Sequence, residues 1–224
     1  MITFDLFSAL IDARTGASRV LAAIAAERRW PIDGERLYDE WDRRNKASQR
    51  DEREWIPFAE HCRRSLAATY ADLGLTGPAT VDAAMLLGSV AGWPLWPDVA
   101  AGLPPIAARH RVGVLSNVDD DVFARTKVAA LVPDDAVLTS ERLRAYKPDP
   151  EIYRRARERA GGALVHVATS ARDVRGALEA GVEVIRLRRP GHELDPDGPR
   201  PPREAAGLAE LAELLSRGAG RAGG

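Results

Sequence analysis

The sequence predicts an α/β protein: a Rossmann-like parallel β-sheet core flanked by helices, with an all-helical insertion after the first strand. Two observations predict this fold. Short apolar, β-branched runs alternate with helical stretches through the C-terminal part of the chain, which is typical of βαβ units and a parallel sheet. One further run of this kind opens the chain, and it is followed by a long stretch, residues 15–90, whose pattern is helical throughout.

The first strand is expected over Met1–Phe7, "MITFDLF", and the helical stretch follows it. In "ASRVLAAIAAERRW", Val20, Leu21 and Ile24 share one helical face. The segment "IPFAEHCRRSLAATYADLGL" ends at Gly74, as helices commonly do. Two more segments, "DGERLYDEWDRRNKASQR" and "TGPATVDAAMLLGSV", also have helical patterns. We therefore expect four helices in this part of the chain.

After residue 90, strands and helices alternate. The expected elements are, in order, a helix in "VAAGLPPIAARH", a strand in "RVGVLSN", a helix at Val122–Leu131, a strand in "AVLTS", a helix at Pro150–Ala160, a strand in "ALVHVATS", a helix in "ARDVRGALEAG", a strand in "VEVIRL", a Pro-rich loop in "RRPGHELDPDGPRPPRE" and a helix in "AAGLAELAELLSR". The near-continuous apolar strands indicate a sheet covered on both faces. Residues 1–14 and 91–224 then form the α/β core domain, and residues 15–90 form a helical domain.

The composition is that of an ordinary globular protein, with 45% hydrophobic and 29% charged residues. The formal net charge of −1 creates no field that would attract nucleic acid. No apolar run is long enough to span a membrane, and the N-terminus lacks the pattern of a signal peptide. The single cysteine, Cys62, excludes an internal disulfide and a thiolate metal cluster. We therefore expect a cytoplasmic protein with no nucleic-acid or membrane partner.

Polar side chains lie at the ends of four expected strands. Asp5 lies in the first strand, Ser116 and Asn117 follow "VGVL", Lys147 follows "AVLTSERLRAY", and "ATSARD" supplies Asp173. In open α/β sheets, ligands bind beyond the carboxyl ends of the strands, where the strand order reverses. We therefore expect these side chains to meet at one edge of the sheet.

These residue types suit nucleophilic chemistry. Asp5 could attack an electrophilic carbon or phosphorus and form a covalent ester. Lys147 would keep Asp5 ionised, and Ser116 and Asn117 could hold an anionic group. Asp173 could orient Lys147 or help to activate the water that cleaves the ester. Each residue alone has a structural interpretation, as a turn, a solvated loop or a helix start, so their order along the strands carries the prediction.

The histidines show no metal-ligand spacing, and we expect all four to be structural or exposed. They are His61, His110, His166 and His192.

Four segments, in order, resemble the motifs of the haloacid dehalogenase-like hydrolase superfamily. They are "FDLFSALID", "VLSN", "YKPDPEIY" and "VATSARDVRGALEAG". The resemblance covers nearly the whole chain, and the helical insertion is similar to the superfamily's cap domain in kind and position. It implies that Asp5 is the catalytic nucleophile of a hydrolase.

Two positions distinguish the branches of this superfamily. Its magnesium-dependent phosphatases carry a second aspartate where this chain has Phe7, and an acidic metal ligand where it has Thr169. Mg²⁺ prefers several oxygen ligands, so these changes count against a magnesium site.

The chain more closely resembles the metal-independent L-2-haloacid dehalogenases. They share the aromatic residue at Phe7, the Ser116-Asn117 pair, and a lysine followed six residues later by a tyrosine, here Lys147 and Tyr153. The resemblance implies that Asp5 attacks the α-carbon of a small anionic substrate and expels halide. Water then hydrolyses the ester to a 2-hydroxy acid without any cofactor.

The chain departs from this branch in places. Ser8 and Ala9 replace a Gly-Thr pair, which removes the threonine hydroxyl beside the nucleophile, and Ala168 and Ser170 replace a serine and an asparagine. A halide-binding arginine that follows a tryptophan in the cap is here Asp42, although Arg43 or Arg44 could take its place. The residues expected to contact substrate are Phe7, Ser8, Tyr153, Ser170, Arg43 and Arg44.

Two alternatives stay open. One is a magnesium-dependent phosphatase acting on a small phosphate ester, and the other is a catalytically silent binding or regulatory protein with the same fold. The state of assembly is also open, because Trp93, Trp96 and the leucine-rich faces of the helical domain could serve either a core or a homodimer.

Overall fold

A computed structural model describes residues 1–219 of the chain, and it contains a six-stranded, fully parallel sheet. The strand order is β3-β2-β1-β4-β5-β6. The strands are β1 (Ile2–Phe4), β2 (Val112–Ser116), β3 (Val137–Thr139), β4 (Val165–Ala168), β5 (Glu183–Leu187) and β6 (Arg203–Ala205). The parallel α/β core expected from the sequence is confirmed.

The first strand lies at the centre of the sheet, because β1 pairs with β2 on one side and with β4 on the other. Thr3 is the register partner of both Gly113 and His166. The strand order reverses at β1, and such a reversal opens a crevice at the carboxyl ends of the strands. Asp5, directly after β1, therefore lies at the mouth of this crevice.

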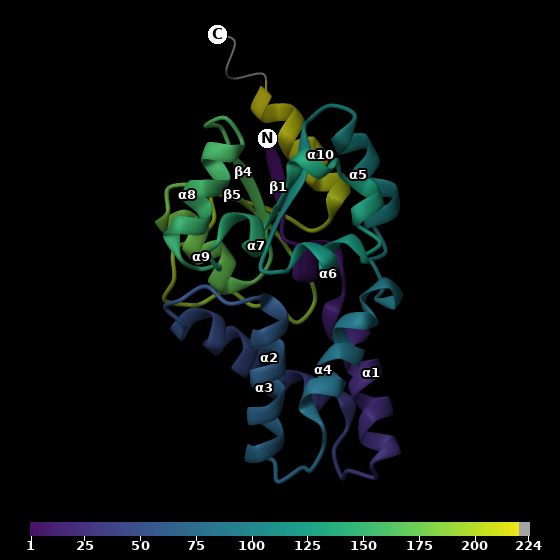
Figure 1. Cartoon of the computed structure of the whole chain (residues 1–224). Helices are drawn as coiled ribbons and strands as arrows, with labels where there is room; N and C mark the ends of the chain where they lie inside the picture. The colour runs from purple at the N-terminus through teal and green to yellow at the C-terminus, as the bar shows by residue number, and fades with distance from the viewer. Residues whose placement is uncertain (220–224) are drawn as a thin grey trace.

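Helices cover both faces of the sheet, as the apolar strands indicated (Figure 1). The helices are α5 (Val99–Ala107), α6 (Asp120–Ala124), α7 (Ser140–Leu143), α8 (Pro150–Arg159), α9 (Ala171–Glu179) and α10 (Leu208–Ala219). Neighbouring residues of one strand belong to different apolar clusters: Val114 packs in the cluster that includes α5 and α10, and Leu115 packs in the cluster that includes α8 and α9. This alternation follows from the pleat of a strand.

The helical insertion extends from one end of the sheet (Figure 1). Its helices, here called the cap, are α1 (Ala13–Glu27), α2 (Gly34–Asp51), α3 (Phe58–Asp72) and α4 (Ala79–Gly88). The chain leaves and re-enters the core at adjacent points, because Ile11 and Leu95 form an antiparallel bridge and Asp12 N donates to Pro94 O. The domain boundaries at 14/15 and 90/91 stay a prediction. No described helix combines the length and the apolar character needed to cross a bilayer.

Two tryptophans considered for a dimer face pack inside this chain. Trp93 is buried, its ring centroid lying 5.6 Å from that of Phe7. Trp96 is half-buried, and its Nε1 donates to Ser8 O at 2.9 Å. Both residues therefore support the core around the crevice.

The structure corrects two predicted elements. The first strand ends at Phe4 rather than Phe7, and Leu6–Leu10 form a π-helical turn, because the Asp5 carboxylate accepts the Ser8 backbone N–H and so caps that turn. The helix expected at Val122–Leu131 is broken into α6 and a 3-10 turn, Ala129–Leu131. Between them, Thr126 Oγ1 and N both bond to Phe123 O, which ends the helix.

A sixth strand, β6, lies in the segment expected to be a Pro-rich loop and was not predicted. Pro201 and Pro202 immediately precede it. Because β6 is an edge strand that pairs only with β5, prolines at its start remove no hydrogen bond from the sheet interior.

Gly176, on α9, sets how closely this helix approaches the loop that carries Lys147. A Cβ at Gly176 would lie 2.7 Å from Pro148 Cβ and 2.9 Å from Pro148 O. We expect Gly176→Ala to lower the free energy of unfolding by about 1–3 kcal/mol through overpacking, measured by urea denaturation. Gly88→Ala is the matched control, because nothing lies within 4 Å of its added methyl group. Equal stability of the two variants would contradict this close packing.

Candidate active site

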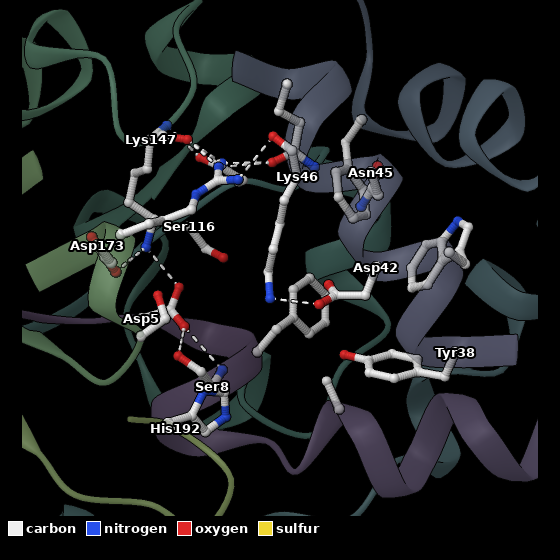
Figure 2. Close-up of a pocket in the computed structure, with 18 of the residues that line it drawn as sticks. Asp5, Ser8, Tyr38, Asp42, Asn45, Lys46, Ser116, Lys147, Asp173 and His192 are labelled. Atoms are coloured by element: carbon white, nitrogen blue, oxygen red, sulfur yellow. Dashed lines mark hydrogen bonds and ion pairs between the residues drawn. The ribbon is translucent and has the colours of Figure 1, made fainter. Parts of the chain in front are cut away.

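A cavity of about 120 Å³ lies between the carboxyl edge of the sheet and the cap (Figure 2). Asp5, Ser116, Lys147, Asp173, Ser170 and Arg172 line it from the core. An apolar wall is formed by Phe7, Ala13, Phe58, Leu87 and Trp93, and α2 contributes Tyr38, Trp41, Asp42, Asn45, Lys46 and Gln49. The cavity thus has a charged floor, one apolar wall and one polar wall.

Asp5 is held from two directions. Its Oδ1 accepts from Lys147 Nζ at 2.6 Å, and its Oδ2 accepts from Ser8 N at 2.9 Å and Ser8 Oγ at 2.5 Å. Burial favours the neutral acid, but the Lys147 charge and these hydrogen bonds outweigh it, so the pKa of Asp5 lies below its usual value. Ala9 carries no hydroxyl, as the sequence shows, but the neighbouring Ser8 supplies one to the Asp5 carboxylate.

Lys147 joins the two buried carboxylates. Its Nζ donates to Asp5 Oδ1 and Asp173 Oδ2, both at 2.6 Å, and to Leu115 O at 3.0 Å. These three acceptors use all three ammonium protons. Although burial disfavours the cation, Asp173 and Asp5 raise the pKa of Lys147 above its usual value. Asp5, Lys147 and Asp173 therefore form a fully ionised triad.

Asp173 is held by three side chains. Besides Lys147, its carboxylate contacts Tyr153 Oη at 2.8 Å and His166 Nε2 at 3.1 Å. His166 Nδ1 in turn lies 3.0 Å from Thr3 Oγ1. Burial opposes ionisation of Asp173, but Lys147 and His166 overcome it and hold its pKa well below the usual range.

Tyr153 is fully buried behind Asp173 and does not line the cavity. Its predicted contact with substrate is corrected: the fixed position of α8 places its hydroxyl on the Asp173 carboxylate. His166, which we expected to be structural or exposed, is buried in β4 and supports Asp173. A polar residue in an apolar strand was its only sequence signal.

Asn117 holds the backbone of Lys147 rather than pointing freely into the cavity. Its Oδ1 accepts from Lys147 N at 2.7 Å, and its Nδ2 donates to Lys147 O at 2.9 Å and to Gln49 Oε1 at 2.8 Å. Arg172 also donates to Lys147 O, and its Nη1 donates to Lys46 O at 3.0 Å. Because Gln49 and Lys46 belong to α2, these bonds tie the cap to the segment that carries Lys147.

Two predicted residues of the cap lie away from the cavity. Arg43 Nη2 pairs with Glu40 at 3.2 Å, and Arg44 pairs with Glu40 and Asp72, both at 2.6 Å. Each residue turns a helix by about 100°, so when Trp41 and Asp42 face the cavity, the next two residues face elsewhere. The expectation that Arg43 or Arg44 faces the site is therefore corrected.

Asp42 brings its own counter-ion into the cavity. Its Oδ2 accepts from Lys46 Nζ at 2.5 Å, one turn further along α2 (Figure 2). Lys46 was not among the predicted site residues, although its i,i+4 spacing from Asp42 indicates an ion pair on one helix face. The ion pair moderates the repulsion that Asp42 alone would exert on an anion.

Phe7, Ser8, Ser116 and Ser170 were selected from the sequence and line the cavity, and their roles stay predictions; His192 lines it too but was not selected. Ser116 is buried at the end of β2, and its hydroxyl points into the cavity (Figure 2). His192 reaches the cavity from the loop that follows β5. Burial and the nearby Lys46 charge lower the pKa of His192 below its usual value.

The residues present do not fit a magnesium site. Within residues 1–219, no group of three or more His, Cys, Asp or Glu side chains could hold a metal ion. An ammonium, not an open position, lies between Asp5 and Asp173. Thr169 donates its hydroxyl to Leu187 O at 2.9 Å and is fully buried, so it adds no ligand.

Residues 1–181 match the haloacid dehalogenase-like hydrolase family. The chain belongs to this family. The (S)-2-haloacid dehalogenase 4A of Burkholderia cepacia is 30% identical over 128 residues, which are 54% of this chain and 55% of that relative. The chain thus spans about half the length of that relative in the match. The (S)-2-haloacid dehalogenase of Xanthobacter autotrophicus is 28% identical over 205 residues, which are 86% of this chain and 76% of that relative.

A solved structure is similar over almost the whole fold. It is the L-2-haloacid dehalogenase from Xanthobacter autotrophicus with chloropropionic acid covalently bound, with a TM-score of 0.80 and 23% identity. The match covers 96% of this chain and 97% of that one. The resemblance to this superfamily and to its dehalogenase branch, inferred from the motifs, is confirmed at the level of family and fold.

We expect Lys147→Met to lower the free energy of unfolding by about 3–5 kcal/mol at pH 7, because two buried carboxylates lose their shared counter-ion. In the parent, the lowered pKa values of Asp5 and Asp173 give stability that is present above their unfolded pKa, 3.8, and is lost as the pH falls through the folded values. In the variant, burial raises both pKa values, so stability should increase from pH 7 to pH 5.

Urea denaturation at both pH values measures this effect. Arg43→Met is the control, because Arg43 is exposed and outside the cavity, and its stability should equal that of the parent. A Lys147→Met variant as stable as the parent at pH 7 would refute the ionised triad.

Proposed function

We propose that this hydrolase breaks the carbon–halogen bond of a small 2-haloacid through a covalent ester on Asp5, with neither metal nor cofactor. The observation that carries the proposal is the ionised Asp5 carboxylate at the floor of a partly apolar cavity. A carboxylate is a weak base but a competent nucleophile when it is held in place next to an electrophilic carbon.

The surroundings of Asp5 suit the first step. Its two oxygens accept three hydrogen bonds, so acceptor capacity remains for attack on carbon. Lys147 balances the charge of the carboxylate without a proton being transferred, because its pKa is raised. Attack would displace halide and leave the substrate carbon bonded to a carboxylate oxygen of Asp5.

The remaining cavity suits a small organic anion. Phe7, Phe58 and Trp93 would pack against the carbon skeleton of the substrate. The Ser116 hydroxyl and the Lys46 ammonium would hold its carboxylate, with Asp42 lowering the net positive charge. The names of the relatives, and the chloropropionic acid bound covalently in one of them, support this substrate class.

The test is isotope labelling in H₂¹⁸O with a panel of 2-haloacids and phosphate esters, followed by mass spectrometry of the Asp5 peptide. Over repeated turnovers, hydrolysis of an Asp5 ester puts ¹⁸O into the Asp5 carboxylate. We expect label with a 2-haloacid, without added metal, and no label in Asp5→Asn, whose turnover should fall by a factor of about 10⁴ or more.

Label that appears only with a phosphate ester and Mg²⁺ would favour a phosphatase instead. Absence of label with every compound, from a parent that is folded by circular dichroism, would favour a silent binding protein. Label in Asp5→Asn preparations would show that another group, or a contaminant, carries the reaction.

A further inference from the structure

Hydrolysis of an ester on Asp5 needs a group that removes a proton from the attacking water. Asp173 is the carboxylate expected from the sequence to help activate this water, but its oxygens already contact Lys147, Tyr153 and His166, which all favour its ionised, weakly basic form. Its side chain is 3% exposed, so water has little access to it. A carboxylate that is so strongly stabilised in its ionised form is also a poor base.

Most other ionisable groups of the cavity cannot readily accept a proton from water. Lys147, Lys46 and Arg172 are cations without an acceptor. Asp42 is held by Lys46 at 2.5 Å. The His192 ring lines the same cavity and makes no hydrogen bond within the described residues. It is thus the group in the cavity whose nitrogen lone pair is free.

The loop that carries His192 is fixed on both sides. Arg186, in β5, donates from Nη2 to His192 O at 2.6 Å, and His192 N donates to Arg189 O at 3.3 Å. Arg189 is itself anchored, because its Nη2 donates to Ala9 O at 2.9 Å and its Nη1 pairs with Asp98 at 2.8 Å. Both arginines are buried. These contacts therefore fix the position of the loop that carries the His192 imidazole.

Gly191 contributes the turn that directs the next residue inward. Its φ of 77° lies in the left-handed region, which glycine adopts without strain. His192 consequently lies on the floor side of the cavity, near Ser8 and Asp5, opposite the α2 side chains (Figure 2).

We propose that His192 is the general base that activates water in the second half of the reaction; this rests on the proposed function. His192 takes one proton from water as the water oxygen bonds to the Asp5 carbonyl carbon. The bond between that carbonyl carbon and the ester oxygen, which is bonded to the substrate α-carbon, then breaks. The imidazolium returns its proton to the leaving alkoxide, which gives the hydroxy acid, and the regenerated Asp5 loses its proton to solvent.

The charges around His192 favour a neutral ring at the step in which water is deprotonated. Burial and Lys46 lower its pKa, whereas Asp5, Asp42 and Asp12 raise it, and the net shift is downward, so the ring is neutral at pH 7. Formation of the ester removes the negative charge of Asp5. One of the influences that favour the imidazolium is then gone, and the ring is neutral when water must be deprotonated.

The test is rapid quenching of His192→Gln and His192→Asn with the 2-haloacid that labels the parent. We expect one equivalent of halide per enzyme, the Asp5 ester accumulating in the mass spectrum, and kcat lowered by a factor of about 10²–10⁴. The parent's kcat should fall as the pH is lowered through the His192 pKa, below 6.5, and this limb should be absent from both variants.

Two controls separate the outcomes. His110→Gln, before β2 at the far end of the sheet, should turn over like the parent. Asp42→Asn should not accumulate ester; accumulation there, with normal release by the His192 variants, would overturn the proposal in favour of Asp42. Unchanged turnover and pH profile in both His192 variants would also overturn it. A parent that forms neither ester nor product would overturn the proposed function itself.

Discussion

The position of one ammonium group constrains most of this structure. Lys147 Nζ satisfies Asp5 at the end of β1, Leu115 O in β2 and Asp173 at the start of α9, so these three elements must meet within the reach of one side chain. If the ammonium were displaced, two buried carboxylates would lack a counter-ion, which is a costly arrangement. The strand order, the Asn117 contacts with the lysine backbone and the close approach of Gly176 all keep it in place.

Much of this core could be read from the sequence. Parallel strands alternate with helices in a regular way, and their carboxyl ends share one edge, so the sequence alone groups Asp5, Lys147 and Asp173. The structure brings these three together. Where the dehalogenase pattern has Gly-Thr, this chain has Ser8-Ala9, and Ser8 donates two hydrogen bonds to the Asp5 carboxylate from its backbone N–H and its hydroxyl.

The features that the sequence did not predict depend on side-chain direction and on contacts between segments far apart in the chain. The choice between Arg43, Arg44 and Lys46 depends on the exact rotation of α2 over the cavity, and residue types alone do not give it. His192 enters from a loop whose course is set by buried arginines, and no periodic pattern marks such a loop. The edge strand β6 was hidden by the prolines before it.

The bridge between Ile11 and Leu95 places the two ends of the cap next to each other on the core. Because the two ends of the insertion meet at one place on the core, an insertion of another length could join there without changing the strand order of the sheet. Arg172, Gln49 and Asn117 restrict this freedom, because they join α2 to the segment of Lys147. A different cap would therefore leave the position of Asp5 unchanged, but it would have to replace the hydrogen bonds that Gln49 and Lys46 make with the core.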